Sequence, residues 1–136
     1  MPLDARYIGS TLAIPLKVKA GGGLYVLTSP TAVLRQSIYV ILATRIGERL
    51  LNPEFGSRLP ELLFEPNDII LATLGTQYIR EALRRWEPRI EVETVTWDPP
   101  VGSQRTVRIG YVETRTRRQE NQLFPWFNGQ GLQYAA

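Results

Sequence analysis

The chain has 136 residues, a formal net charge of +3 and a hydrophobic content of 43%, and it contains neither cysteine nor histidine. This length suits one domain with a single hydrophobic core and leaves no room for a second full domain. The missing residue types exclude disulfides, thiolate nucleophiles, zinc–thiolate sites and triads that need an imidazole, so any catalysis would rest on carboxylates, Lys, Tyr or Arg.

The sequence carries no sign of membrane insertion or secretion. Its longest uninterrupted apolar stretch, residues 38–43, is far shorter than the roughly 18 to 20 residues that cross a bilayer. The first residues lack the basic and apolar regions of a secretory signal. We therefore expect a protein that is made and kept in the cytoplasm and that has no membrane partner.

The first half of the chain predicts two short strands and a helix. Residues 12–18 alternate between apolar and other side chains, which is typical of a half-buried strand, and Pro15 places that strand at a sheet edge. Three glycines at 21–23 turn the chain into a second short run, residues 24–27. A helix is expected from about residue 30 to 45, because Ser29 can cap it and a proline suits its first position.

Residues 47–64 predict an ordered loop with one short helical turn over residues 59–64, because Pro53, Gly56 and Pro60 prevent a long regular element. The loop is too apolar to extend into solvent, so we expect it to fold back over the core. Its apolar side chains are Leu50, Leu51, Phe55, Leu59, Leu62, Leu63 and Phe64.

A second helix is predicted over residues 69–86, capped by residues 66–68 and ended by Pro88. Two strands then form a hairpin, residues 90–97 and 105–116, with a bulge or twist near Thr94. The order of elements predicts an α+β fold in which two helices pack on a small antiparallel or mixed β-sheet, with a C-terminal hairpin and an extended C-terminal tail.

The composition changes at residue 119, so we divide the chain into one domain, residues 1–118, and an aromatic-containing tail, residues 119–136. The tail is rich in Gln, Asn and Gly, carries aromatic residues without periodicity, and cannot build its own core. Exposed aromatic side chains are costly in water, so the tail either packs back over the body or docks on a neighbour. We favour an arm that docks on a neighbour.

Arginine accounts for 14 of the 16 cationic residues, and these arginines gather in two groups. One group lies at positions 80, 84, 85 and 89, and the other at 105, 108, 115, 117 and 118. Each group could be a solvated face, a protein interface or a track for phosphates. Because Glu91, Glu93 and Glu113 interrupt the basic hairpin, we expect protein partners and no nucleic acid, and keep an Arg-rich nucleic-acid-binding protein as the alternative.

Five short segments carry a family resemblance. In chain order they read Ile38-Tyr-Val-Ile-Leu-Ala-Thr44, Arg45-Ile46-Gly47-Glu48-Arg49, Asn52-Pro53-Glu54-Phe55-Gly56-Ser57, Leu63-Phe64-Glu65-Pro66-Asn67-Asp68 and Trp86-Glu87-Pro88-Arg89-Ile90. Together they resemble the short baseplate-wedge, or sheath-initiator, family of contractile phage tails, which has counterparts in type VI secretion baseplates and extracellular injection particles. The resemblance covers about residues 29–112.

What the resemblance implies is a structural protein of a tail baseplate, assembled in the bacterial cytoplasm, that is no enzyme and uses no cofactor or small-molecule substrate. Six copies are expected around the tube, with sheath, wedge and tube or hub proteins as partners. Family members resemble the strand-exchanging part of the sheath subunit and start sheath assembly by offering sheet edges that sheath strands complete.

The resemblance also implies roles for particular residues. Glu87, Pro88 and Arg89 would contact the helical bundle of the wedge, although the same three residues could instead form a purely internal clamp at the helix-to-strand corner, with Glu87 holding Arg49 or Arg89. The hairpin would receive the sheath strand, at Arg105, Val107, Arg108, Ile109 and Tyr111. We assign a structural role to a third set, Gly47, Glu48, Arg49, Pro53, Phe55 and Gly56.

Some relatives have been labelled tail lysozymes, so a peptidoglycan hydrolase is a further alternative. A glycosidase needs two carboxyl groups facing across a cleft, one with a raised pKa. The available carboxylates are Glu48, Glu54, Glu61, Glu65 and Glu87. Each lies beside Pro, Gly or Arg, where pairing or capping explains it, so we expect no catalytic residue.

Overall fold

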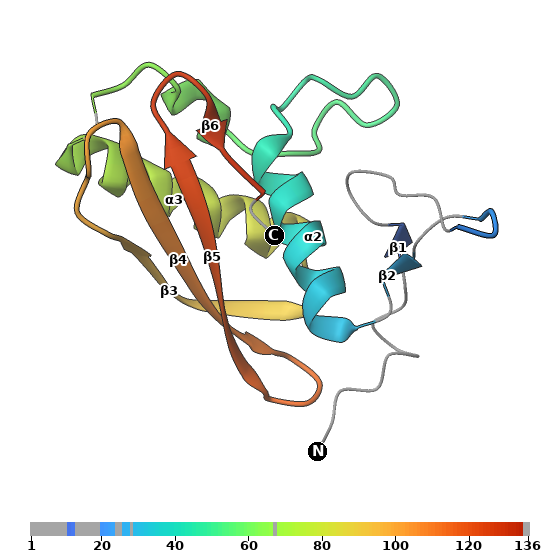
Figure 1. The fold of residues 1–136 in the computed structure, drawn as a ribbon. Helices are drawn as coiled ribbons and strands as arrows, with labels where there is room; N and C mark the ends of the chain where they lie inside the picture. The colour runs from blue at the N-terminus through green and yellow to red at the C-terminus, as the bar shows by residue number, and fades with distance from the viewer. Residues whose placement is uncertain (1–10, 13–19, 24–25, 28, 67, 135–136) are drawn as a thin grey trace.

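A computed structural model of the chain describes residues 11–12, 20–23, 26–27, 29–66 and 68–134. Figure 1 shows two helices and a curled antiparallel sheet. The helices are α2 (Pro30–Ala43) and α3 (Ile69–Trp86), with a short 3₁₀ turn, η1 (Leu59–Leu62), between them; the sheet follows the order β3 (Ile90–Trp97), β4 (Gln104–Glu113), β5 (Gln119–Phe127) and β6 (Gly131–Leu132). The predicted α+β fold class is confirmed.

The N-terminal strands are seen only in part. β1 (Thr11–Leu12) pairs antiparallel with β2 (Val26–Leu27) as a separate two-stranded ladder. Most of the edge strand expected over residues 12–18 lies outside the described residues.

α2 begins at Pro30 as expected and ends at Ala43, two residues before the predicted end. Ser29 is its N-cap residue, but the Ser29 side chain makes no capping hydrogen bond. Its backbone carbonyl accepts the Val33 N–H at 2.9 Å instead. α2 contributes buried apolar side chains at the three- and four-residue spacing of a helix: Val33, Leu34, Ile38, Ile41 and Leu42.

α3 matches the predicted span. Asp68 caps it with one carboxylate oxygen, which accepts the N–H groups of Ile70 at 2.9 Å and Leu71 at 3.3 Å. Gly75 allows Trp97 of β3 to lie directly on the helix, since a Cβ at that position would overlap the indole ring. This contact packs the first half of α3 against the end of β3.

The hairpin of β3 and β4 forms as predicted, with the register shift between Val92 and Thr94. Gly110 lies opposite Thr94, where a side chain would collide with the Thr94 hydroxyl. Alternate residues of β4 belong to the core, and Val107, Ile109 and Tyr111 are almost fully buried.

The segment after residue 118 extends the sheet, where an extended tail was expected. Gln119–Phe127 forms β5, which pairs with β4 along its whole length, and β6 pairs with the end of β5. Phe124 and Trp126 are 0% and 1% exposed. The alternation of apolar and polar residues that predicts a strand is broken here, because the buried position 122 carries a polar glutamine. The Gln122 amide donates to the Tyr111 hydroxyl at 3.2 Å. Of the two alternatives, residues 119–134 therefore pack against the body of the same chain.

The loop between α2 and η1 projects from the helices at the upper right of Figure 1. The expectation that all of it folds back over the core is wrong. Leu59 and Leu62 are buried and Phe55 packs against the core, but Leu50 and Leu51 are 97% and 101% exposed. Phe64, after η1, is also exposed.

Candidate interaction site at the helix–strand corner

Glu87 lies at the turn from α3 into β3, and its carboxylate is held inside the protein. Its side chain is only 2% exposed. Arg89 donates Nε to one oxygen at 2.6 Å and Nη2 to the other at 2.8 Å, and Ser37 of α2 donates its hydroxyl to the second oxygen. This two-pronged ion pair identifies Arg89, rather than Arg49, as the partner of Glu87.

The pKa of Glu87 reflects two opposing effects. Burial alone would raise the pKa, but hydrogen bonds from Arg89 and Ser37 outweigh burial and lower it below the usual value of 4.5. The Glu87 carboxylate correspondingly raises the pKa of Arg89. Both groups are therefore charged at neutral pH, and the corner is an internal ion pair.

The corner also ties together the elements around it. The Arg89 carbonyl accepts the Thr114 N–H at 3.0 Å and the Thr114 hydroxyl at 3.2 Å, which joins the start of β3 to the end of β4. Ser37 links the same corner to α2. Sequence reasoning missed Ser37 and Thr114; the available signal for Ser37 was a polar residue directly before the buried Ile38.

The outer side of the corner remains accessible. Pro88 is exposed, and the Arg89 side chain is 30% exposed although it is paired. The internal clamp is therefore present, while the wedge contact implied for Glu87, Pro88 and Arg89 stays a prediction.

A groove with a volume of about 550 Å³ runs beside Pro88, between the last turns of α3 and β3. Two arginines of α3, Arg80 and Arg84, stand on one side of it. Arg80 donates to the Glu93 carbonyl of β3 at 3.1 Å. The groove is lined by Arg80, Arg84, Pro88, Ile90, Glu91, Val92 and Thr114.

The hairpin residues expected to receive a sheath strand lie on a central strand. β4 pairs with β3 on one side and with β5 on the other, so these residues offer no unpaired strand edge of their own, and the strand addition expected at them stays a prediction. The side chains have internal contacts: Arg105 is 8% exposed and donates to the carbonyls of Asp98 and Asp68, while Arg108 pairs with the Asp98 carboxylate at 3.1 Å. Within the described residues, the open edge of this hairpin belongs to β3.

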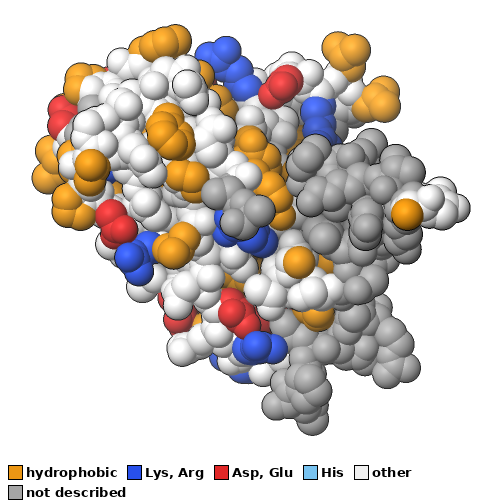
Figure 2. Space-filling view, viewed as in Figure 1, with side chains coloured by type: hydrophobic (Ala, Val, Ile, Leu, Met, Phe, Trp, Pro, Cys, Tyr) orange, Lys and Arg blue, Asp and Glu red, His pale blue; other side chains and the backbone are white. Residues whose placement is uncertain are grey.

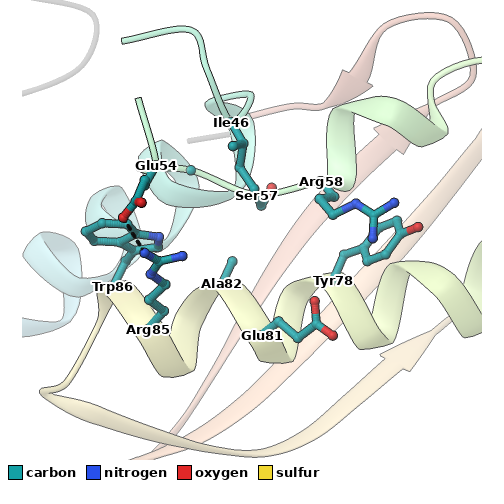
Figure 3. A pocket seen from close by; sticks show the side chains of 10 residues that line it. Ile46, Glu54, Ser57, Arg58, Tyr78, Glu81, Ala82, Arg85 and Trp86 are labelled. Atoms are coloured by element: carbon teal, nitrogen blue, oxygen red, sulfur yellow. Dashed lines mark hydrogen bonds and ion pairs between the residues drawn. The ribbon is translucent and has the colours of Figure 1, made fainter. Parts of the chain in front are cut away.

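Residues 54–58 form a strap across α3, shown in Figure 3. Glu54 pairs with Arg85 at 2.6 Å, and the Phe55 and Trp86 rings meet with centroids 5.2 Å apart. Arg58 completes the strap by stacking its guanidinium 4.6 Å from the centroid of the Tyr78 ring.

The glycines and charged residues of the preceding loop give it a defined shape. Gly56 has φ +119°, and a Cβ there would overlap the Thr44 carbonyl oxygen. Gly47, at φ +93°, donates its N–H to the Pro53 carbonyl at 2.7 Å. A Glu48 carboxylate oxygen accepts the Arg45 N–H at 2.9 Å. These contacts within the loop are consistent with the structural role expected for residues 47–49, 53, 55 and 56.

Most arginines of the two basic groups meet acceptors of this same chain. Among the described residues, the ion pairs of these groups have N–O distances of 2.6 to 3.8 Å and are Arg85–Glu54, Arg89–Glu87, Arg108–Asp98, Arg117–Glu91 and Arg118–Glu120. Paired guanidiniums offer less positive potential to phosphates than the sequence alone suggests.

No helix in the described part of the chain combines the length and hydropathy needed to cross a bilayer. The same residues contain no cluster of three acidic side chains that could hold a metal ion.

The chain matches a known protein family over more than half of its length. Residues 28–119 match the family model described as baseplate wedge protein gp25. The chain belongs to this family. It is a baseplate wedge component, and such proteins are part of the tail baseplate of a virion or contractile injection particle.

Three known proteins illustrate the relationship. Baseplate wedge protein gp25 of Enterobacteria phage T4 is 38% identical over 58 residues, which are 43% of this chain and 44%, less than half, of that relative. A solved structure described as a tail lysozyme from Geobacter sulfurreducens is 31% identical, with a TM-score of 0.68 over 82% of this chain and 99% of that one. A chain of the anti-feeding prophage baseplate shares the fold, at 20% identity and a TM-score of 0.60 over 90% of this chain and 86% of that one.

Proposed function

We propose that this baseplate wedge protein initiates the sheath by accepting a strand from the first sheath ring at the open edge of β3. The observation that carries the proposal is the position of β3: it pairs with β4 on one side and, in the described part of the chain, with no strand on the other. An edge strand presents unpaired N–H and C=O groups that an added strand can satisfy in register.

The register identifies which β3 groups face outward. The Asp98 N–H bonds the Thr106 carbonyl, so Thr96 and Thr94 continue the hydrogen-bonded pairs with β4. Val95 and Trp97 therefore direct their N–H and C=O groups away from β4. The bulge after Val92 and the Arg80 contact with the Glu93 carbonyl interrupt this edge, so the added strand would pair with the second half of β3.

The second part of the proposal is that the corner docks on wedge proteins. Pro88 and the exposed part of Arg89 form its outer surface, while Glu87 acts through Arg89 by fixing the direction of the guanidinium. With the corner on the wedge and β3 toward the sheath, six copies would surround the tube and connect it with tube or hub proteins.

A structural role is better supported than a hydrolytic one, although one structural relative is described as a tail lysozyme. Glu54 and Glu61 are in ion pairs and Glu48 bonds a backbone N–H. The pKa of buried Glu87 is lowered, which is opposite to the requirement for a general acid. These carboxylates hold the loop and the corner, so we propose no catalysis.

The test is a proline at Val95 in the bacterium that produces the particle. Proline removes the outward N–H without breaking the β3–β4 ladder, because edge strands tolerate proline at such positions. We expect baseplates and tubes without sheaths, counted by negative-stain microscopy.

Val95→Thr is the matched control, since it keeps the N–H and nearly the same side-chain volume. It should give normal sheaths. Circular dichroism of both purified variants shows whether each remains folded. If folded Val95→Pro supports full sheaths, the β3 edge does not receive the sheath strand.

A further inference from the structure

The α2–η1 loop presents two leucines that the protein itself does not cover. Leu50 and Leu51 are 97% and 101% exposed, although they lie next to each other at a loop tip. In the space-filling view, hydrophobic side chains project from this loop at the upper right (Figure 2). These two adjacent, almost fully exposed leucines form an apolar knob, which we call the dileucine tip.

The loop below the tip is held by backbone hydrogen bonds. The Gly47 N–H bonds the Pro53 carbonyl at 2.7 Å, which closes the intervening residues into a tight loop. At its base, the Ser57 N–H bonds the Thr44 carbonyl at 2.9 Å, and the Ser57 hydroxyl donates to the Leu42 carbonyl at 2.8 Å. The tip is therefore presented in a defined geometry, which reduces the entropy lost when a partner covers it.

A chain of contacts connects the tip to the corner. Next to Leu50, the Arg49 guanidinium lies 4.3 Å from the centroid of the Phe55 ring. Phe55 in turn meets Trp86, the last residue of α3, directly before the corner. These contacts connect the residue beside the dileucine tip with the residue directly before the corner, so one partner that is large enough could touch both.

The charges around the tip indicate the chemistry of the surface that covers it. Arg45 and Arg49 are exposed, and neither forms an ion pair within the ranges that the structure describes. Glu48 directs a carboxylate oxygen to the Arg45 backbone N–H, so its charge is partly engaged by the loop itself. A convex apolar tip with two cations beside it is complementary to an apolar hollow with carboxylates at its rim.

We propose that the dileucine tip inserts into an apolar pocket with an acidic rim on the same baseplate protein that docks at the Glu87-Pro88-Arg89 corner. This inference rests on the proposed function, because that function places a partner at the corner. The tip supplies the apolar anchor, and the corner supplies the polar contacts of one continuous interface.

The first experiment locates the partner with a photo-crosslinking amino acid in native particles. p-Benzoylphenylalanine replaces Leu51 in one strain and Arg84, in the groove beside Pro88, in another. We expect crosslinks from both positions to one baseplate protein, with the Leu51 crosslink among apolar residues flanked by Asp or Glu.

The two proposals fail in different ways. If position 84 crosslinks to a baseplate protein and position 51 crosslinks to a different protein or to none, the dileucine inference is overturned and the corner proposal stands. If position 84 gives no baseplate partner, the corner proposal fails and the inference fails with it.

The second experiment measures the contribution of the tip. Leu50→Ser with Leu51→Ser should lower incorporation into particles by about tenfold or more, since each fully buried leucine contributes on the order of tenfold in affinity. Val101→Ser, at another exposed apolar residue, is the matched control and should incorporate normally. Equal incorporation of all variants overturns the inference.

Two other occupants would also overturn it. One is a second copy of this chain, detected as leucine-dependent self-association of the purified protein in sedimentation velocity. The other is a lipid surface, detected as leucine-dependent co-sedimentation with vesicles of phosphatidylethanolamine and phosphatidylglycerol at 3:1. The expected result is a purified chain that stays monomeric and unbound in both assays.

Discussion

The corner and the dileucine tip are both short irregular segments next to a helix end, yet the burial of their side chains is the opposite of what polarity suggests. At the corner, the charged Glu87 is turned inward and both its oxygens are occupied. At the tip, the apolar Leu50 and Leu51 are turned outward and are almost fully exposed. Backbone and pairing geometry thus decide which side chain is covered: a buried charge is part of the structure at the corner, while two leucines stay exposed at the tip.

The largest effect is expected at Gly56, which gives the loop its direction. Gly56→Ala places a Cβ against the Thr44 carbonyl at a positive φ, so we expect a loss of about 4 kcal/mol in the free energy of unfolding. Urea titration of the purified chain measures it. Gly47→Ala is the comparison, because Gly47 also has a positive φ but open space around its Cβ, and it should cost about 1 kcal/mol. Equal losses would show that the contact with Thr44 is unimportant.

The next effect concerns the buried charge at the corner. Glu87→Gln keeps the shape but removes the charge, and should lower the free energy of unfolding by about 2 kcal/mol at pH 7. Arg89→Lys, which cannot form two parallel hydrogen bonds, should lower it by a smaller amount.

The sign of the pH dependence follows from the lowered pKa. The ion pair stabilises the protein fully above the usual Glu value of 4.5, and this contribution is lost as the pH falls through the lower pKa of the folded state. The difference between wild type and Glu87→Gln should therefore shrink below about pH 4.5. A difference that persists unchanged at pH 3 would contradict the role assigned to the charge.

A smaller effect is expected for the ion pair that fastens the strap below the tip. The side chains of Arg85 and Glu54 are 57% and 71% exposed, so Glu54→Gln should cost at most about 0.5 kcal/mol. High salt should abolish even this difference in melting temperature. A loss that is several times larger would mean that the strap depends on this pair rather than on Phe55 and Trp86.

The smallest effect on stability is expected at the tip itself. Leu50→Ser with Leu51→Ser changes two almost fully exposed side chains, so the free energy of unfolding should change by less than about 0.5 kcal/mol. Denaturant unfolding is the measurement. A stability loss comparable to that of Glu87→Gln would place the leucines in the core and remove the contrast between the two regions.

Local patterns predicted much of the fold. The span of α3 and its Asp68 cap, the hairpin and the bulge before Thr94 follow from periodicity, proline and capping chemistry, all of which act over a few residues. The pairing of Glu87 with Arg89 was one of two options, because residues two apart around a proline turn can approach each other. The strand at residues 119–127 was missed because its alternation includes a buried Gln122.

Periodicity, proline positions and capping chemistry therefore predict the class of fold, the ends of the second helix and the residues that form the corner. Local patterns could not predict which strand of the hairpin is the open edge, because that depends on the long-range pairing of β5 with β4. Nor could they predict that Leu50 and Leu51 face outward while Phe55, a few residues later, packs inward. All three side chains are apolar and favour burial. The hydrogen bonds and glycine geometry of the loop determine which of them this chain can cover.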